Sequence, residues 1–293
     1  MTALLEARHA QARRTPAFRV PRDVIAYNVN TKRRHGFVVY DGPSVLDPKT
    51  PIVAILRAPW SAKANTKLGI GVDALTIFLR DMKPSEAVRS GADAAVCGNC
   101  RLRPTNGGGC YVRMFPGPDS THHAHTMNPY PRLEDPDAYR GRIIRMSEWG
   151  DAAAIPIEVW EDLRARLPAL TWLAYTHQWR DLDVARWGWC MASVETEKAA
   201  LEARAAGWRT FRARRPGSPK MEGEIVCPAA KEAVTSARMT CDFCRLCRGT
   251  EVKRRDGTLA ASITLDAHGI YARYVSQENL RFGLRSKLRA GKT

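Results

Sequence analysis

Eight cysteines are the residues of this chain best suited to chemistry, and all of them lie between Cys97 and Cys247. A secreted disulfide scaffold is normally shorter and rich in cysteine throughout, and the N-terminal sequence MTALLEARHAQARR has no apolar stretch that would serve as an export signal. Reduced thiols that bind a metal therefore explain the cysteines better than disulfides do. The sequence predicts a cytoplasmic metal-binding protein.

Three of these cysteines form the first cysteine group, which is Cys97, Cys100 and Cys110, in a loop predicted to follow a strand. Three thiolates leave one coordination position vacant, which a reactive metal centre requires. Cys190 could supply a fourth ligand, although a lone cysteine in a strand is more often a buried free thiol. We expect an open site in which the first cysteine group alone holds an iron–sulfur cofactor.

Four cysteines nearer the C-terminus form the second cysteine group, with the spacing Cys-x13-Cys-x2-Cys-x2-Cys: Cys227, Cys241, Cys244 and Cys247. Thiolates two residues apart in a turn can converge on one centre, whereas disulfides between such close neighbours have unfavourable Cα geometry. Four thiolates complete a tetrahedral zinc site, and the repeated Cys-x2-Cys step resembles the cluster loop of bacterial ferredoxins. The pattern favours an iron–sulfur cluster, with zinc as the alternative. In either case the metal could serve only to stabilise the C-terminal fold.

Asp151 and His177 are candidate catalytic residues because each follows one of two consecutive predicted strands. Side chains at the carboxyl ends of parallel strands meet at the mouth of the sheet, where a histidine can move a proton and an aspartate can orient it. The structural alternative is that Asp151 caps the following helix and that His177 is a hydrogen-bonded loop residue. A role at the mouth and a purely structural role are both open.

A His-x-His pair in the stretch Thr121-His-His-Ala-His-Thr126 suggests a further alternative, a rolling-circle nuclease with Tyr130 or Tyr139 as nucleophile. In such nucleases both histidines lie on a central strand of the sheet and bind the divalent metal there. Prolines and glycine on both sides of this stretch predict a loop instead. The nuclease is therefore the weaker hypothesis.

The elements that must position these residues follow from apolar runs and turn residues along the chain. Strands are predicted at 36–40, 51–56, 74–79, 142–146, 170–175, 188–193, 208–212 and 224–227, with helices at 157–167, 195–206 and 228–234. Strands that alternate with helices indicate βαβ units and a parallel sheet. Five or six of these strands, from 74–79 onward, belong to such units. We expect an α/β protein with a partial parallel barrel or an open parallel sheet, since the N-terminal hairpin region leaves too few residues for a full eight-stranded barrel of ~250 residues.

Four regions follow from this pattern. Residues 1–22 are predicted to form a basic arm or helix, and residues 23–72 a strand and β-hairpin region. Residues 73–226 form the α/β core with the loop of the first cysteine group, and residues 227–293 a C-terminal cysteine-rich metal module with a basic tail. No apolar run is long enough to cross a membrane, so no membrane partner is expected.

The formal net charge of +16 is concentrated at the two ends of the chain. Residues 1–40 hold 8 Lys and Arg against 2 Asp and Glu, and residues 201–293 hold 19 against 9, whereas the middle is neutral. Basic clusters at 32–34, 212–215 and 253–255 could neutralise phosphates, so nucleic acid is the expected partner. The alternative is a solvated basic surface.

Several short motifs, taken in order, resemble the gene-product-88-like proteins of phages and plasmids over residues 65–270. They are Asn65-Thr-Lys67, the first cysteine group with Tyr111, Gly117-Pro-Asp-Ser120, Ile144-Arg-Met-Ser147 with Gly150-Asp151, Tyr175-Thr-His-Gln-Trp179, and the terminal Cys-x2-Cys-x2-Cys followed by His268-Gly269. This resemblance implies a protein of a mobile element and supplies no activity.

The chain also resembles radical S-adenosylmethionine enzymes, which carry three cluster-binding cysteines after the first strand of a partial barrel and sometimes a second, C-terminal cluster. The resemblance implies the first role for Cys97, Cys100 and Cys110 and the second role for the second cysteine group. It also implies an S-adenosylmethionine cofactor. The spacing here, Cys-x2-Cys-x9-Cys, differs from the usual Cys-x3-Cys-x2-Cys, and no glycine-rich methionine-binding segment follows the second strand.

Two hypotheses of different kinds follow. The first is an iron–sulfur protein of a phage or plasmid that acts on or with nucleic acid, in the manner of a divergent radical S-adenosylmethionine enzyme. The second is a zinc-bearing, non-enzymatic nucleic-acid-binding replication protein in which both cysteine groups are structural.

Overall fold

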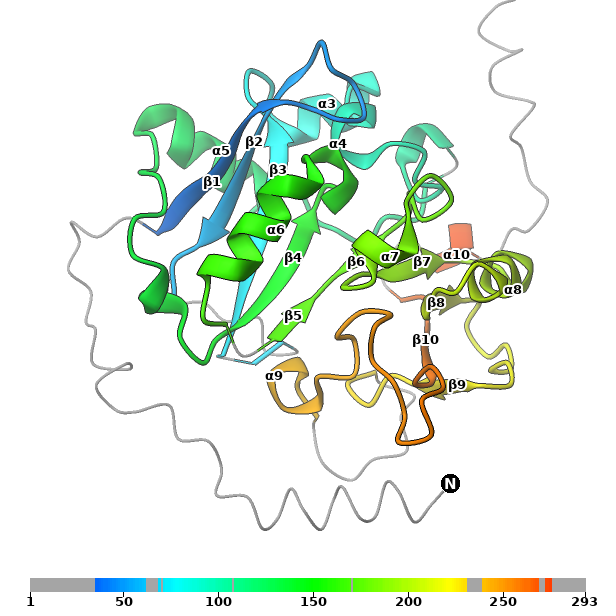
Figure 1. The fold of residues 1–293 in the computed structure, drawn as a ribbon. Coiled ribbons are helices and arrows are strands. Elements are labelled where there is room, and N and C mark those ends of the chain that lie inside the picture. Colours follow the sequence, from blue (N-terminus) through cyan, green and yellow to red (C-terminus); the bar gives the residue numbers. More distant parts are fainter. Residues whose placement is uncertain are drawn as a thin grey trace, which may run out of the picture.

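The computed structural model describes residues 35–61, 68–69, 71–106, 108–169, 171–230, 239–268 and 272–275. Their strands form two five-stranded sheets that meet near the centre of the molecule (Figure 1). The strands are β1 (Gly36–Pro43), β2 (Pro51–Arg57), β3 (Val72–Leu79), β4 (Ile143–Trp149), β5 (Thr171–Leu173), β6 (Tyr175–Thr176), β7 (Met191–Val194), β8 (Thr210–Arg214), β9 (Glu224–Val226) and β10 (Ser262–Asp266).

The first sheet has the order β1-β2-β3-β4-β5. Strands β1, β2 and β3 pair antiparallel, as the predicted N-terminal hairpin region requires, and β3, β4 and β5 pair parallel. All eight residues of β3, VDALTIFL, are buried. Burial along the whole strand is typical of a parallel strand that is covered on both faces, and the buried Asp73 within it is paired with Arg142.

The second sheet has the order β6-β7-β8-β10-β9, and every pair in it is parallel. Only Ala174 separates β5 from β6, so one stretch of chain ends the first sheet and begins the second. The parallel strands thus continue from β3 to β9 without closing into a barrel. The expected α/β class with an open parallel sheet and an N-terminal hairpin region is confirmed.

Short helices connect and cover the strands. They are α3 (Pro84–Ser90), α4 (Ala94–Cys97), α5 (Pro118–Met127), α6 (Ile157–Arg166), α7 (Val184–Trp187), α8 (Glu197–Ala205), α9 (Cys241–Cys244) and α10 (Ala272–Val275), with 3₁₀ turns at Pro104–Asn106, Pro136–Tyr139 and Ala152–Ala154. Helix α6 crosses the front of β4 in Figure 1 and buries Trp160 and Leu163 there. Thr196 caps α8 by accepting a hydrogen bond from the Ala199 amide, and Gly207 follows the helix at φ +86°.

The main core lies between the sheet and these helices. Trp149, Trp179, Trp187 and Trp189 are all buried, as expected for residues that pack the layers. Trp187 and Trp189 stack with ring centroids 5.3 Å apart, and Trp160 lies 6.0 Å from Trp189. These aromatic side chains hold α6 and α7 on one face of the sheet.

Two features differ from the expected elements. Strand β10 was not predicted, and it belongs to the segment assigned to the C-terminal module, yet it lies between β8 and β9 in the core sheet. Strand β1 extends beyond the predicted end at residue 40 to Pro43, and the chain turns at Ser44–Thr50. The predicted arm at 1–22 and most of the helix at 228–234 lie outside the described residues, while 228–230 form a turn.

A search of the described helices finds none with the length and apolar character needed to cross a membrane.

Candidate functional site

A cavity of about 650 Å³ lies on the inner face of the parallel strands. Successive side chains of a strand point to opposite faces, so Phe211 and Ala213 of β8 line the cavity while Arg212 and Arg214 lie on the covered side. Cysteines of both groups line it as well: Cys97, Cys100, Cys110, Cys227, Cys241 and Cys247. The sheet therefore brings the two predicted cysteine groups to one space.

The first cysteine group lies at the carboxyl ends of the strands, in the long connection after β3. Cys100 packs with Ala267 and Val275, which follow β10, while Cys97 and Cys110 lie against the same cluster. The three thiols are close enough for their charges to interact. The connection after β3 thus reaches from the first sheet to the carboxyl end of β10 in the second sheet.

Hydrogen bonds from several elements hold the first cysteine loop in place. Buried Arg103 pairs with Asp93 through two bonds of 2.7 and 3.0 Å and donates to the Gly98 carbonyl. Gln178, which follows β6, donates to the Cys97 carbonyl at 3.0 Å and accepts from the Asn99 amide. Gly98 has φ +53°, and a Cβ atom there would lie 2.5 Å from the Gln178 side chain. The loop conformation therefore depends on residues of two other segments.

His177 lies at the mouth of the cavity between two carboxylates and a thiol. Its Nε2 atom lies 3.1 Å from Oε1 of Glu195, at an angle unsuited to a hydrogen bond, and its Nδ1 lies 3.9 Å from Oδ2 of Asp151. Burial works against a charge on His177, but the Cys100 thiolate and Glu195 outweigh burial and raise its pKa well above the ordinary value. A protonated imidazole beside the first cysteine group can donate a proton at the cavity.

Asp151 joins the ends of two parallel strands. Its carboxylate accepts from the Ala153 amide at 3.0 Å, from the Thr176 hydroxyl at 2.8 Å and from the His177 amide at 2.7 Å. It therefore caps the 3₁₀ turn after β4, whereas the following helix α6, which the structural alternative had it cap, begins after Pro156; Asp151 also lines the cavity. A catalytic role for Asp151 stays a prediction, and its three hydrogen bonds give it a structural role as well.

The strand β4 is irregular where it enters the cavity. Its pairing with β3 shifts register between Arg145 and Trp149, and Ser147 has φ +54°, which is uncommon for a residue other than glycine. Such a bulge redirects side chains, so that every residue from Ser147 to Asp151 lines the cavity.

Two members of the second cysteine group, Cys241 and Cys247, lie toward the amino ends of the first parallel strands. They pack against Val72 and Ile143, the first residues of β3 and β4, and against Leu68 and Leu173. Cys244 does not line the cavity, but its charge interacts with those of Cys241 and Cys247. Cys227 directly follows β9, at the carboxyl end of that strand, and its charge also acts on Cys241.

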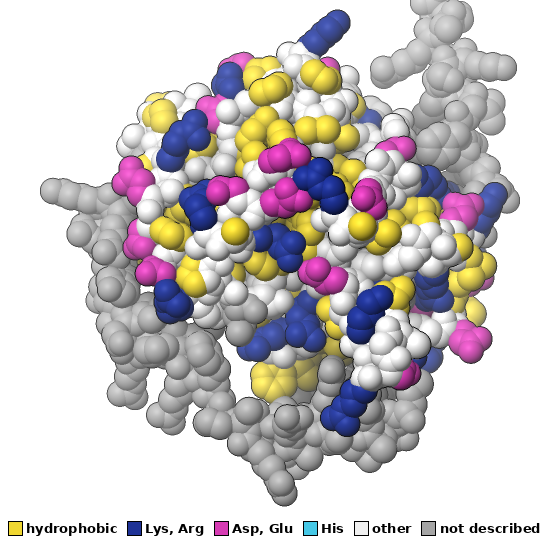
Figure 2. All heavy atoms as spheres, viewed as in Figure 1, with side chains coloured by type: hydrophobic (Ala, Val, Ile, Leu, Met, Phe, Trp, Pro, Cys, Tyr) yellow, Lys and Arg dark blue, Asp and Glu magenta, His cyan; other side chains and the backbone are white. Residues whose placement is uncertain are grey.

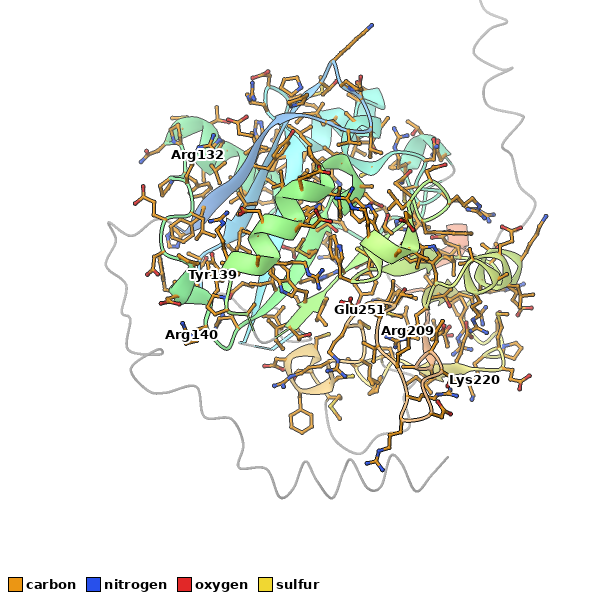
Figure 3. The ribbon with its side chains drawn as sticks, in the orientation of Figure 1. Arg132, Tyr139, Arg140, Arg209, Lys220 and Glu251 are labelled. Atoms are coloured by element: carbon orange, nitrogen blue, oxygen red, sulfur yellow. The ribbon has the colours of Figure 1, made fainter. Side chains whose placement is uncertain are left out.

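Two contacts attach the second group to the sheet. The Asp242 amide donates to the Leu68 carbonyl at 2.9 Å, and a Cβ atom on Gly69, which has φ +92°, would collide with the Asp242 carboxylate. Buried Arg209, which lies beside β10 in Figure 3, donates to the carbonyls of Leu246 at 3.0 Å and Gly249 at 2.5 Å. A glycine and an arginine from distant parts of the chain therefore hold the turns around Cys241 and Cys247.

Burial changes the acidity of the thiols in both groups. It raises the pKa of Cys97 well above its ordinary value and that of Cys241 to about 11, and it also raises the pKa of Cys110 and Cys247. All eight cysteines are free of disulfides. A bound metal must therefore displace protons from these thiols when it binds.

Cys190 lies apart from the first cysteine group. It is fully buried, it does not line the cavity, and the charges that act on it belong to Asp151, Arg164 and Glu251, none of them a thiolate. The default interpretation of a buried free thiol therefore suits its position.

Replacing Cys190 with alanine should leave the metal content of the protein unchanged. The variant should lose only about 1 kcal/mol of unfolding free energy, the cost of a small core cavity. Metal analysis with denaturant unfolding checks this expectation. A fall in metal content would instead make Cys190 a ligand and close the open position that the first group is expected to have.

Within the described residues, no three or more His, Cys, Asp or Glu side chains are arranged so that they could hold a single metal ion. The stretch expected to supply a His-x-His pair is helix α5, in which residues two apart face different sides. His122 contacts the Arg80 carbonyl and His125 accepts from the Tyr130 amide. The strand context that the nuclease hypothesis requires is replaced by a helix.

One of the three basic clusters proposed to bind phosphates is buried. Arg212 forms two hydrogen bonds of 2.7 and 2.8 Å with buried Glu224, and Arg214 pairs with Asp266 at 3.0 Å. On the face shown in Figure 2, Lys and Arg side chains are interspersed with Asp and Glu. The cluster at 253–255 is exposed, and that at 32–34 lies outside the described residues. The expectation for 212–215 is therefore wrong for Arg212 and Arg214, because acidic partners from later strands pair with them.

The site also contains residues that the sequence interpretation missed. Glu195 follows β7 in the way that Asp151 follows β4, so the same rule of polar residues after parallel strands could have identified it. The sequence did not identify Arg145 and Gln178 as site residues. Each belongs to one of the short motifs, at 144–147 and 175–179, but neither residue was given a role.

Comparison of the chain with protein-family models, with curated proteins and with solved structures found no match.

Proposed function

We propose that this chain is an iron–sulfur enzyme whose first cysteine group binds a cluster at the mouth of the cavity. The observation that supports this most is the convergence of Cys97, Cys100 and Cys110 at the carboxyl ends of parallel strands, beside the charged His177. A closed structural site would not need an adjoining cavity of this volume, whereas a small-molecule substrate does.

The donor set suits a cluster better than a single ion. Cysteine thiolates are the usual ligands of iron–sulfur clusters. The three thiols of the first group are close enough for their charges to interact, as the ligands of one cluster must be. The second cysteine group, with Cys241, Cys244 and Cys247, offers a further site by the same chemistry.

The chain's own residues have distinct tasks in this proposal. Gln178 and Arg103 fix the first cysteine loop, His177 holds a proton at Nε2 or Nδ1 beside Cys100, and the apolar lining limits access of water. A cluster with three cysteine ligands supplies electrons and one open iron position when bound. S-adenosylmethionine is the ligand for that position that the radical-enzyme resemblance implies.

Electron paramagnetic resonance tests the open position. The protein is purified anaerobically, reduced with dithionite, and measured with and without S-adenosylmethionine. The proposal predicts a cluster signal whose first-group component disappears in the Cys97→Ser/Cys100→Ser/Cys110→Ser variant, which leaves only the signal of a cluster in the second group. A change in that signal on adding S-adenosylmethionine would support that cofactor, and an unchanged signal would argue against it. A wild-type protein without any cluster signal contradicts the proposal.

A substitution in the second group should lower metal content and stability together. Metal-binding free energy is partly folding free energy, so Cys244→Ser should both lose metal and melt at a lower temperature. Phe243→Ser is a matched control, because Phe243 is an exposed neighbour on the same turn. Unchanged metal content and melting in Cys244→Ser would remove Cys244 from the ligand set.

The alternative function is a zinc-bearing, non-enzymatic nucleic-acid-binding protein of a mobile element. What favours it is the basic excess at the chain ends together with the exposed residues 253–255. Nucleic acid as a partner, and an origin in a phage or plasmid, stay predictions from the sequence under either function.

A further inference from the structure

Arg145 carries a permanent charge in the wall of the cavity. It is the third residue of β4, and its strand neighbours in register are Ala74 of β3 and Leu173 of β5. Neither neighbour offers a carboxylate. The guanidinium lines the cavity together with Leu173, on the face opposite buried Ile144 and Met146.

Few hydrogen bonds satisfy this side chain. Nη2 of Arg145 donates to the Tyr111 hydroxyl at 2.9 Å. A guanidinium has five N–H donors in a planar fork, and this bond uses one of them. In the part of the chain that the structure describes, Arg145 takes part in no ion pair. Several donors of Arg145 are therefore left for a group that enters the cavity.

The other charges around the cavity are already compensated. Glu148 pairs with Arg57 at 3.1 Å, and Asp266 pairs with Arg214 at 3.0 Å. Asp151 accepts three hydrogen bonds, from two backbone amides and the Thr176 hydroxyl. Arg145 is the one Lys or Arg among the described residues that line the cavity. Among the described residues Arg145 thus has no carboxylate within ion-pairing distance, and Glu148, whose charge acts on it, is already paired with Arg57.

The position of Arg145 also relates it to both cysteine groups. Its hydrogen-bond partner Tyr111 is next to Cys110 in the first group, and its charge acts on Cys241 of the second. With metal bound, both groups would carry thiolate charge, and an anion between them would be repelled unless a cation compensated it. A planar guanidinium binds a carboxylate or a phosphate through two parallel hydrogen bonds.

We propose that Arg145 anchors the carboxylate or phosphate of a small anionic substrate inside the cavity. The proposal rests on the proposed function for the identity of the substrate-binding cavity, and it adds the chemical class of the substrate. A volume of about 650 Å³ suits a single small molecule and excludes a nucleic-acid duplex.

The test measures anion binding by the full chain, purified anaerobically, with inorganic phosphate and with acetate as probes at constant ionic strength. Isothermal titration gives the affinity, and the tighter probe identifies the group that the site prefers. Arg145→Gln should weaken binding of that probe by about tenfold or more, since hydrogen bonds to a charged group are lost. Arg145→Lys keeps the charge without the fork, so it should bind with intermediate affinity and serves if Arg145→Gln folds poorly.

Arg140→Gln is the matched control. Arg140 is exposed beyond the edge of the sheet, as Figure 3 shows, and its removal lowers the net charge equally without touching the cavity. This control should bind the probe as the wild type does. The inference is overturned if neither anion binds the wild type, if Arg145→Gln binds as tightly as the control, or if that variant loses metal while its anion affinity is unchanged. A wild type that lacks iron but binds phosphate through Arg145 would contradict the proposed function and leave this inference standing.

Discussion

Replacing Cys100 with serine is expected to remove the cluster of the first cysteine group while the second group keeps its metal. Cys100 is buried among Ala267 and Val275 and lies beside His177, so solvent cannot easily supply a substitute ligand. A serine hydroxyl does not ionise near neutral pH and is a poor ligand for iron. Iron and acid-labile sulfide per chain should therefore fall to about half of the wild-type values, and all cavity chemistry should be lost.

Cys190→Ala provides the control for this experiment, because it removes a buried thiol that lies outside both groups. It should retain the full iron and sulfide content. Full iron and sulfide in Cys100→Ser as well would show that the first cysteine group holds no cluster, whatever the second group binds.

Replacing Glu224 with glutamine should strongly destabilise the fold. Glu224 is buried, accepts two hydrogen bonds from Arg212, and has Arg204 at 3.5 Å. The substitution leaves the buried Arg212 charge with only the more distant, exposed Glu197 at 3.9 Å, at a cost of about 3–5 kcal/mol of unfolding free energy. Denaturant unfolding of the apoprotein and of the metal-loaded protein measures this loss.

Glu222→Gln is the control for Glu224→Gln, because Glu222 is exposed two residues away. It should change the unfolding free energy by less than about 0.5 kcal/mol. The double variant Arg212→Met/Glu224→Leu should recover most of the lost stability, since an apolar pair can replace a buried ion pair. A double variant as unstable as Glu224→Gln would show that the ion pair has a role beyond balancing charge.

Much of the parallel sheet could be predicted because its strands are short apolar runs bounded by turn residues. The same regularity indicated that Asp151 and His177 would lie at the carboxyl ends of neighbouring strands, and both line the cavity. The first cysteine group lies in the connection after β3, but α3 and α4, which were not predicted, intervene, and Cys97 is the last residue of α4.

Features that depend on pairing over long distances in sequence could not be predicted. Strand β10, SITLD, alternates polar and apolar residues over only five positions, and its place between β8 and β9 is set by their shared hydrogen bonds. Arg212 and Arg214 resemble a phosphate-binding cluster until Glu224 and Asp266 are brought beside them by the fold. The local sequence shows that Arg212 and Arg214 are charged, but it does not show which acidic residues will pair with them.

The candidate site shows the same limit. Arg145 gave no signal in the sequence, because an arginine within a strand can face solvent, a carboxylate or a cavity. Only the register of β3, β4 and β5 places it between apolar neighbours and toward the open space. The residues that fix the first cysteine loop, Arg103 and Gln178, likewise depend on contacts with Asp93 and Cys97 that the fold creates.

The most direct test of an iron–sulfur cluster in this protein is metal analysis combined with electronic absorption of the full chain purified without oxygen. We predict a brown protein that contains iron and acid-labile sulfide and absorbs near ~400 nm, with absorption that decreases on reduction by dithionite. A colourless protein with stoichiometric zinc and no iron would contradict the iron–sulfur proposal and would favour the structural, nucleic-acid-binding alternative.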